Sequence, residues 1–513
     1  MTKCRIPKIY RNSFNCVRYL RVLTVALGTL PICFEVAYAE KKISEVSQQC
    51  IDCHSVATPV IVQSWKRSRH AAMTPGEALK KKDLEKRLSA KQVPATLAET
   101  VVGCAECHRM NPGAHQDLFE HNEERVHVTV TPRDCRTCHP VEADQYEKNI
   151  MSHAHGNLAD NELYKLMMTS INGVSTVDKD LRVSVAPPEQ LTNADSCYSC
   201  HGTALKILGK TVRDTSYGEM EFLKIEGWPN QGVGRVNLDD SKGSCASCHT
   251  MHDFSIVMAR KPYTCSQCHK GPDVPAYQAY SVSKHGNLYS SKERYWNMDQ
   301  VPWAAGRDFS APTCATCHVS LITSVDGDVI AHRTHQMNDR LPWRIFGLVY
   351  AHPHPKSPDT SIIRNKDGQP LPTSLDGDIA AQFLISKDEM TTRKSTIQKI
   401  CKGCHTENWT DGHWSKFENS LTTTDKMTLT ATTLIRSAWK EKLADPSNPF
   451  DEAIERLWVE QWLFYANSTR FASAMMGADY GVFANGRWFL SRNIRDMIDR
   501  IGCLRSQRSS NKP

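Results

Sequence analysis

The sequence predicts a mainly α-helical fold that is built around bound groups and ends in a helical region without them. Three observations predict this fold class. The motif Cys-x-x-Cys-His occurs eight times before residue 406. Runs with the pattern of strands are few, while connectors rich in proline and glycine, such as "NPGAH" and "HPHPKSPD", are common. Beyond the last motif, apolar residues recur at helical spacing.

The eight motifs are the most specific feature of the chain, because this spacing attaches c-type haem. Two thiols add across the vinyl groups on one edge of the porphyrin, and the adjoining histidine ligates the iron as the proximal ligand. Zinc sites and disulfide frameworks do not require a histidine after every second cysteine. The sequence therefore predicts a multihaem cytochrome c with eight covalently bound haem c groups. The attachment residues are Cys50, Cys53 and His54; Cys104, Cys107 and His108; Cys135, Cys138 and His139; Cys197, Cys200 and His201; Cys245, Cys248 and His249; Cys265, Cys268 and His269; Cys314, Cys317 and His318; and Cys401, Cys404 and His405.

The number of motifs also limits the fold. The predicted octahaem domain spans residues 40–405 of a chain of 513 residues. With about 59 residues for each motif beyond residue 39, side chains alone can form little apolar core. We therefore expect the porphyrins to act as the core, with helices and long loops packed around them.

The N-terminus predicts export. Six lysines and arginines precede an apolar run, "VLTVALGTLPICF" (22–34), and "AYA" (37–39) has the pattern of a cleavage site. Residues 1–39 are therefore expected to be a secretory signal peptide. An uncleaved membrane anchor is the alternative, although the apolar run is short for a span. We expect a mature chain without a transmembrane anchor, in the periplasm or an equivalent extracytoplasmic compartment.

The leader also holds most of the net charge. The whole chain has a formal net charge of +7, and residues 1–39 contribute +5 of it. The mature chain therefore has no excess of basic residues that would indicate nucleic acid as a partner.

The histidines outside the motifs determine which haem irons have a second histidine ligand and which keep a coordination position free for substrate. Thirteen of the 21 histidines remain after the proximal ligands are set aside, which is enough to saturate every iron. Counting alone therefore does not reveal an open site. His115, His121, His332 and His413 are expected to be structural. The expected distal ligands are His70, His127, His252, His285 and His335, with His155 and His354 as candidates from the pairs His153/His155 and His352/His354.

The C-terminal helical region is predicted to span residues 406–513. In residues 448–477 the apolar side chains of Phe450, Ile454, Trp458 and Trp462 recur on one helical face. Residues 427–443 and 487–502 are expected to form flanking helices. This haem-free region is expected either to cap the haem core or to form a subunit interface.

The eight motifs and the helical tail, together with "YAHPHP" (350–355), "NKDGQPLPT" (365–373) and "WLFYANSTRF" (462–471), resemble the octahaem hydroxylamine oxidoreductase family. Its members include hydroxylamine- and hydrazine-oxidising multihaem cytochromes c of ammonium-oxidising and anammox bacteria. The resemblance implies a homotrimer in which the fourth haem, here at His201, is five-coordinate and catalytic, and the other seven are bis-histidine relays. It also implies that a tyrosine from a neighbouring subunit is cross-linked to that haem in oxidising members. Tyr480 is similar in position, with Tyr465 as a second choice, and an anammox source would place the chain in the anammoxosome.

The sequence departs from the family pattern in the residues expected around the fourth haem. The family pattern resembles "GPDH", an acid followed by a histidine, with a tyrosine just before the seventh motif. Here the matching stretches are "GPDV" (271–274) and "GRDFSAPTCATCH" (306–318). Asp273 is retained and is expected to face the fourth haem and exchange protons, whereas Val274 and Phe309 replace the histidine and the tyrosine.

The resemblance implies an oxidoreductase that acts on small nitrogenous substrates. Oxidation of hydroxylamine to nitric oxide or nitrite, or of hydrazine to dinitrogen, is favoured by Asp273 and Tyr480, with a soluble cytochrome c as the electron acceptor. A member that reduces nitrite or nitric oxide is one alternative. The other is a non-catalytic electron-transfer subunit beside a paralogous multihaem subunit, which Val274 and Phe309 favour.

Overall fold

The computed structural model describes residues 41–180, 182–215 and 217–510. Residues from Lys41 onward form one compact unit. The predicted signal peptide, residues 1–39, lies outside the described residues. Within the described ranges, no helix combines the length and the apolar character that crossing a membrane requires.

Short helices carry the attachment motifs. In three cases the five motif residues themselves form the helix, namely α6 (Cys104–His108), α12 (Cys197–His201) and α17 (Cys314–His318). Residues at positions i, i+3 and i+4 lie on one face of a helix. One helical turn therefore brings both thiols and the histidine of a motif to the same side, as attachment to one porphyrin requires.

Other helices in the motif-bearing part are also short. Several begin at a serine or threonine that caps the first turn; the Ser44 hydroxyl, for example, accepts the backbone N–H of Ser47 at 3.3 Å. These helices are α1 (Glu45–Ala57), α2 (Pro59–Arg67), α3 (Arg69–Ala72), α4 (Pro75–Leu79), α5 (Ala95–Ala98), α7 (Pro132–Arg136), α8 (Pro140–Glu147), α9 (Ala154–Ala159), α10 (Glu162–Asn172), α11 (Gln190–Asp195), α13 (Ile256–Arg260), α14 (Pro262–Ser266), α15 (Ala276–Ser281) and α16 (Lys284–Lys292).

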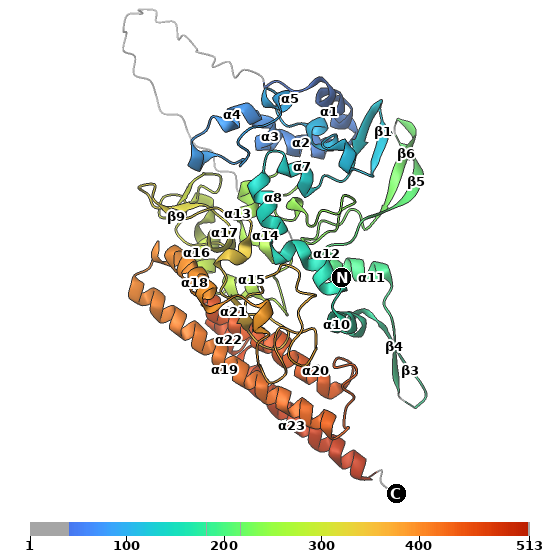
Figure 1. The fold of residues 1–513 in the computed structure, drawn as a ribbon, viewed down its shortest axis with the longest axis vertical. Helices are drawn as coiled ribbons and strands as arrows, with labels where there is room; N and C mark the ends of the chain where they lie inside the picture. Colours follow the sequence, from blue (N-terminus) through green and yellow to red (C-terminus); the bar gives the residue numbers. More distant parts are fainter. Residues whose placement is uncertain (1–40, 181, 216, 511–513) are drawn as a thin grey trace, which may run out of the picture. The chain divides into compact units, whose positions relative to one another are not determined.

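Strands occur mainly as two-stranded antiparallel hairpins, two of which, β3–β4 and β5–β6, extend away from the neighbouring helices (Figure 1). The short pair β10–β11 sets Arg344 opposite His352. In the three-stranded sheet, β7 pairs in parallel with β8, and β8 pairs antiparallel with β9. The strands are β1 (Leu118–His121), β2 (Glu124–His127), β3 (Val174–Val177), β4 (Val183–Ala186), β5 (Lys206–Thr215), β6 (Gly218–Glu226), β7 (Trp303–Ala304), β8 (Ile322–Thr323), β9 (Val329–Ala331), β10 (Trp343–Arg344) and β11 (His352–Pro353).

Longer helices form the C-terminal region, where α19 and α23 lie side by side (Figure 1). The helix α19 begins at Glu407, directly after the eighth motif, and its 34 residues include the predicted helix 427–443. The predicted helix 448–477 is divided, because a π-helical turn (Gln461–Ala466) separates α20 from α21. The helices are α18 (Lys387–Lys402), α19 (Glu407–Lys440), α20 (Ala453–Glu460), α21 (Asn467–Met475), α22 (Ala478–Val482) and α23 (Arg487–Ser510).

The largest apolar cluster also lies in this region. The predicted apolar face of 448–477 is buried in it, including Ile454, Trp458 and Trp462. These side chains pack against Ile435 of α19 and Met497 of α23. The mainly α-helical fold class is thus confirmed, and side-chain packing is concentrated where the chain has no attachment motif.

Candidate functional site

The attachment cysteines line open space. Cysteine is among the most often buried residue types, yet none of the sixteen motif cysteines is buried, and Cys53 and Cys404 are exposed. The motif cysteines are therefore less enclosed by protein than cysteine residues usually are. This arrangement fits covalent attachment of haem, whereas a disulfide or a closed zinc site would bury the sulfur atoms.

Five of the eight motif histidines face a second histidine ring at nearly constant spacing, with ring centroids 6.1 to 6.4 Å apart. A metal between two imidazoles needs two metal–nitrogen bonds of about 2 Å plus a ring radius on each side, which together span about 6 Å. The spacing therefore fits one iron between the rings of each pair. The pairs are His54 and His121, His108 and His252, His139 and His70, His249 and His335, and His405 and His285.

Two further histidines lie at this spacing or were predicted differently. The ring of His127, predicted as a distal ligand, lies 6.1 Å from that of His108, and its Nδ1 and Nε2 are 3.2 Å and 3.1 Å from the carbonyls of Thr129 and Met110. A neutral imidazole has one N–H and can donate to only one of these carbonyls. The His127 ring also stacks on the buried ring of His115 at 3.4 Å. Since the ring of His108 has both His127 and His252 at the ligand spacing, the role of His127 as a distal ligand stays a prediction. His121, predicted to be structural, instead faces His54 at the ligand spacing.

The other predicted distal ligands lie outside the five pairs. The Nδ1–H of His155 donates to the carbonyl of Gly202 at 2.7 Å, which leaves its Nε2 free. His354 is buried on β11's C-terminal side, and burial lowers its pKa well below the usual range. Among the described residues, neither ring faces a motif histidine at the 6 Å spacing, so their ligand role stays a prediction.

Thiols of different motifs lie next to one another in a defined order. Close side-chain contacts join the first motif to the second, the third to the fifth, the fourth to the sixth, and the sixth to the seventh. The seventh motif also lies near enough to the eighth for Cys401 to raise the pKa of Cys317. The fourth motif thus contacts the sixth motif, which in turn contacts the seventh. The contacting thiols are Cys50 and Cys104, Cys135 and Cys245, Cys200 and Cys268, and Cys265 and Cys314.

The fourth motif has a distinct environment. The Nδ1–H of His201 donates to the carbonyl of Ala154 at 3.2 Å, which leaves Nε2 free, and burial lowers the pKa of the ring. A neutral imidazole is the form that ligates a metal. Among the described histidines, none faces His201 at the spacing of the five pairs. The charges of three side chains act on the pKa of His201: Asp273 raises it, and Arg344 and His155 lower it.

Tyr164 belongs to the same group of side chains. It lies on α10, and burial raises the pKa of its phenol. The charge of Arg344 lowers this pKa and that of Asp273 raises it, so Tyr164 lies within reach of both. The charges of Asp273 and Arg344, from two separate segments, thus act on the pKa values of both His201 and Tyr164. We call Tyr164, Asp273 and Arg344 the fourth-site cluster; the sequence analysis identified only Asp273.

A buried network holds two members of this cluster in place. The Asn467 amide, at the start of α21, donates to the backbone carbonyl of Asp273 at 2.9 Å. Arg470 donates to the Asn467 side chain at 3.1 Å and to the carbonyl of Ile345, next to Arg344, at 3.3 Å. Arg470 also forms an ion pair with Asp425. The π-helical turn before Asn467 thus precedes a residue that fixes the loop of Asp273, and such turns often occur at functional sites.

The remaining pocket residues predicted from the sequence are placed as follows. Asp273 is exposed and Val274 is half-buried, so the aspartate is not enclosed by apolar walls in the protein alone. Phe309 is 4% exposed and packs against Trp303 at 4.3 Å in a core cluster. Phe309 is thus enclosed by protein, and its place at the wall of the fourth-haem pocket stays a prediction.

Two tyrosines of the C-terminal region were predicted to reach the fourth haem. Tyr480 lies half-buried on α22; burial raises the pKa of its phenol, and the side chain of Ser468 lowers it to a smaller extent. The hydroxyl of Tyr465 donates to Glu460 at 2.8 Å, and its ring stacks on Phe489. The cross-linking role of Tyr480 stays a prediction.

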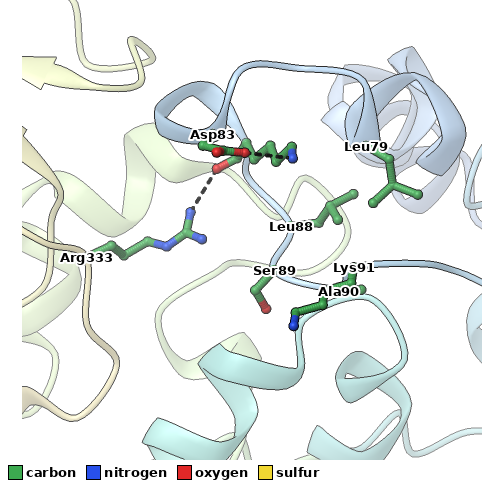
Figure 2. A pocket seen from close by; sticks show the side chains of 8 residues that line it. Leu79, Asp83, Leu88, Ser89, Ala90, Lys91 and Arg333 are labelled. Atoms are coloured by element: carbon green, nitrogen blue, oxygen red, sulfur yellow. Dashed lines mark hydrogen bonds and ion pairs between the residues drawn. The ribbon is translucent and has the colours of Figure 1, made fainter.

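Two surface cavities lie elsewhere. The first, of about 340 Å³, is lined by Leu79, Leu88, Lys91 and Arg333 among others (Figure 2). In it Arg333 donates to the carbonyl of Lys86 at 3.2 Å and pairs with Glu142 at 2.5 Å. The second, of about 470 Å³, borders the eighth motif at Gly403. Neither cavity contains a member of the fourth-site cluster, so neither is the candidate site.

Comparisons with known proteins indicate a multihaem cytochrome. A family model described as "Seven times multi-haem cytochrome CxxCH" matches residues 231–340, and one described as "Cytochrome c554 and c-prime" matches residues 49–130 and 134–222. A Kuenenia stuttgartiensis protein described as a probable nitrite reductase-hydroxylamine oxidoreductase fusion protein is 27% identical over 289 residues. The match covers 55% of this chain and 27% of that protein, so it spans about a quarter of the relative's length.

Solved structures extend the likeness to nearly the whole chain. A structure titled "Hypothetical multiheme protein" is 36% identical, with a TM-score of 0.87 over 92% of this chain and 98% of that one. The Kuenenia stuttgartiensis reducing HAO-like protein complex shares the fold, with a TM-score of 0.61 and 17% identity over 91% of this chain and 86% of that one. The chain therefore belongs to the hydroxylamine oxidoreductase-like family of multihaem cytochromes c, which carry covalently bound haem c.

Proposed function

We propose that the chain is an exported oxidoreductase for small nitrogen compounds and that its substrate reacts at the fourth motif. The observation that carries this proposal is the contrast between His201 and the five paired histidines. His201 has no facing ring in the described chain and is instead near Asp273, Tyr164 and Arg344. His269 and His318 also lack a facing ring among the described residues, and Asp273 acts on the pKa of His269 as well; of these three histidines, His201 is the one on whose pKa both Asp273 and Arg344 act.

Eight attachment motifs would hold eight haem c groups, which when bound supply one-electron transfer and, at the fourth site, an iron position open to substrate. Residues of the chain would hold the fourth haem, transfer protons and position the loop of Asp273. His201 holds the fourth group from its proximal side, and its hydrogen bond to Ala154 fixes the orientation of the ring. The Asp273 carboxylate gives or takes the protons that accompany each electron. Asn467 keeps the Asp273 loop against α21 while this happens.

We further propose oxidation of hydroxylamine to nitric oxide or nitrite, or of hydrazine to dinitrogen, with a soluble cytochrome c as the acceptor. In this proposal the chain forms a homotrimer through residues 406–513, and Tyr480 of one copy reaches the fourth site of the next. The exposed side chains of Met476, Phe483 and Trp488 on either side of Tyr480 support an interface there. A reductive member acting on nitrite or nitric oxide, or a non-catalytic electron-transfer subunit of a larger complex, are the alternatives.

The optical spectrum of the purified, dithionite-reduced protein tests the proposal, recorded before and after hydroxylamine is added. We expect one haem in eight to respond to the ligand, with a red-shifted band if Tyr480 is cross-linked. An ordinary five-coordinate signal that responds to nitrite or nitric oxide would support the reductive alternative. Eight low-spin haems without any response would contradict an enzyme and leave the electron-transfer subunit.

Two single substitutions on the β1–β2 hairpin test the proposed ligand of the first haem. His121→Gln is expected to convert one haem from low-spin to high-spin, because it removes the ring that faces His54. His127→Gln is the comparison variant, since its ring lies 6.1 Å from that of His108 but its nitrogens also lie near backbone carbonyls. Electron paramagnetic resonance of the oxidised protein measures both. A high-spin signal from His127→Gln, with none from His121→Gln, would reverse the two assignments.

A further inference from the structure

Arg340 is a buried cation that contacts the seventh attachment motif directly. It lies at the end of a short 3₁₀-helix and is 2% exposed. One terminal amino group donates to the carbonyls of Thr316 and Cys317, inside the motif, at 3.3 and 3.1 Å. The other donates to the carbonyl of Ser320 at 3.1 Å and to that of His332. All four terminal N–H groups of Arg340 are therefore in use.

The motif helix explains why a cation lies there. Thr316 and Cys317 belong to the last turn of α17, and the last carbonyls of a helix have no partner within it. Arg340 supplies a donor to both carbonyls. The partial negative charge of such carbonyls also favours a cation beside them. The guanidinium is thus held at a fixed place next to the attachment residues of the seventh motif.

The charge of Arg340 is not neutralised by a direct contact. Among the described residues Arg340 forms no ion pair, because its partners are neutral carbonyls. The preceding residue, Asp339, acts on the pKa of Arg340 from an exposed position, and its carboxylate accepts a hydrogen bond from Thr334 at 3.1 Å. Charges away from water are screened much less than charges at the surface. The guanidinium therefore acts on the groups around the seventh motif as a positive charge.

The histidine of that motif lies within reach of this charge. Burial, the charge of Arg340 and that of His269 lower the pKa of His318 to about 4. His318 is the residue expected to ligate the seventh iron. The contacts at Thr316 and Cys317 and the effect on His318 place the same cation on the proximal side of one haem.

We propose that Arg340 raises the midpoint potential of the seventh haem. An iron gains one positive charge when it is oxidised from ferrous to ferric, so a buried cation beside it disfavours the oxidised state. A carboxylate of the porphyrin could cancel this effect by pairing with the guanidinium. The four carbonyls oppose such a pair, because they already accept every terminal N–H of Arg340.

The position of the seventh motif gives the higher potential a consequence for electron flow. Thiols of the fourth motif contact those of the sixth, and thiols of the sixth contact those of the seventh. A higher potential at the seventh iron favours transfer of one electron from the sixth iron, which is oxidised as the seventh is reduced. Flow away from the fourth site rests on the proposed function, whereas the effect of Arg340 on the potential does not.

Spectroelectrochemical titration of the holoprotein tests the inference. Arg340→Gln is expected to lower the midpoint potential of one haem in eight, and Arg340→Lys, which keeps the charge, should leave that potential close to its wild-type value. Asp339→Asn should raise the same potential by a smaller amount, because an exposed carboxylate is screened by solvent.

Two further features make the experiment decisive. The amide of Asp339→Asn can still accept from Thr334, so this variant keeps the test open if Arg340→Gln loads haem poorly. Lys402→Gln is the matched control, since Lys402 lies inside the eighth motif but is exposed and paired with Glu407. It should leave all eight potentials unchanged.

Two results would overturn the inference. An equal fall in potential in Arg340→Gln and Arg340→Lys would assign the effect to the carbonyl contacts and not to the charge. Eight unchanged potentials in Arg340→Gln and Asp339→Asn proteins with full haem content would show that the cation does not act on the haem. If the wild-type protein gave no response to hydroxylamine or nitrite while Arg340→Gln lowered one potential, the proposed function would fail and the role of Arg340 would stand.

Discussion

Asp273→Asn is expected to lower turnover with hydroxylamine or nitrite by about 100-fold or more, the size of effect that loss of a proton-transferring side chain produces. An amide has nearly the same shape as a carboxylate but cannot exchange protons. The Asn467 hydrogen bond should survive, because it is made to the backbone carbonyl of residue 273. Steady-state rates across a range of pH, together with haem content and carbon monoxide binding, measure the effect.

The control for this variant is Asp326→Asn, in the exposed turn between β8 and β9. It should retain the wild-type rate and pH profile. An Asp273→Asn protein that turned over normally, with an unchanged pH profile, would show that protons reach the substrate by another route. Loss of haem content together with activity would instead indicate a structural role for the side chain.

Arg470→Leu is expected to have the largest effect on stability, a loss of about 3–5 kcal/mol in the free energy of unfolding. The substitution leaves Asp425 without its ion-pair partner, and burial already raises the pKa of that carboxyl. It also removes the donors to Asn467 and to the carbonyl of Ile345. Urea unfolding of the holoprotein, followed by far-ultraviolet circular dichroism, measures the change.

Arg436→Leu is the matched control on the same helical region. Arg436 pairs with Asp376 at the surface, where an ion pair contributes about 0–1 kcal/mol. If both variants lost the same free energy, burial of the Arg470 network would not be the reason for its contribution. If Arg470→Leu unfolded normally but no longer bound nitrite, the network would serve the site and not the fold.

The network around Arg470 joins three stretches of the chain that resemble the octahaem hydroxylamine oxidoreductase family. "GPDV", "YAHPHP" and "WLFYANSTRF" are far apart in sequence, and the structure joins them through Asp425, Arg470 and Asn467. Arg470 and Asn467 come from the third stretch, Asn467 binds Asp273 of the first, and the backbone N–H of Ala351 in the second donates to Asp425 at 3.4 Å. The resemblance therefore rested on residues that assemble one site.

Prediction from the sequence was accurate where the chemistry is local. The attachment motifs could be recognised because five consecutive residues make one helical turn with all three binding groups on one side. The apolar face of residues 448–477 could be recognised from its spacing, and Ile454, Trp458 and Trp462 are buried as that spacing predicts. The π-helical turn inside this segment left no signal in the spacing, because one extra residue shifts the face without removing it.

The distal histidines show the limit of such reasoning. His121 and His127 lie on the same hairpin, one on each strand, and spacing favoured His127 because it precedes the third motif. In the structure the ring of His121 faces that of His54, which belongs to a motif and lies 67 residues earlier in the chain. The ring nitrogens of His127 lie near backbone carbonyls. Arg344 could not be identified at all, since a single arginine in a short strand has no distinguishing sequence pattern.

The sequence by itself determined that this protein carries c-type haem, predicted the residues that attach each group, and located the C-terminal helical region. These properties depend on covalent chemistry at fixed spacing and on the periodicity of neighbouring residues. Only the tertiary structure decided which histidines face one another, in what order the motifs meet, and which side chains collect at His201. Those relations join residues up to 200 positions apart, as Asn467 and Asp273 illustrate, and packing rather than local sequence brings such residues together.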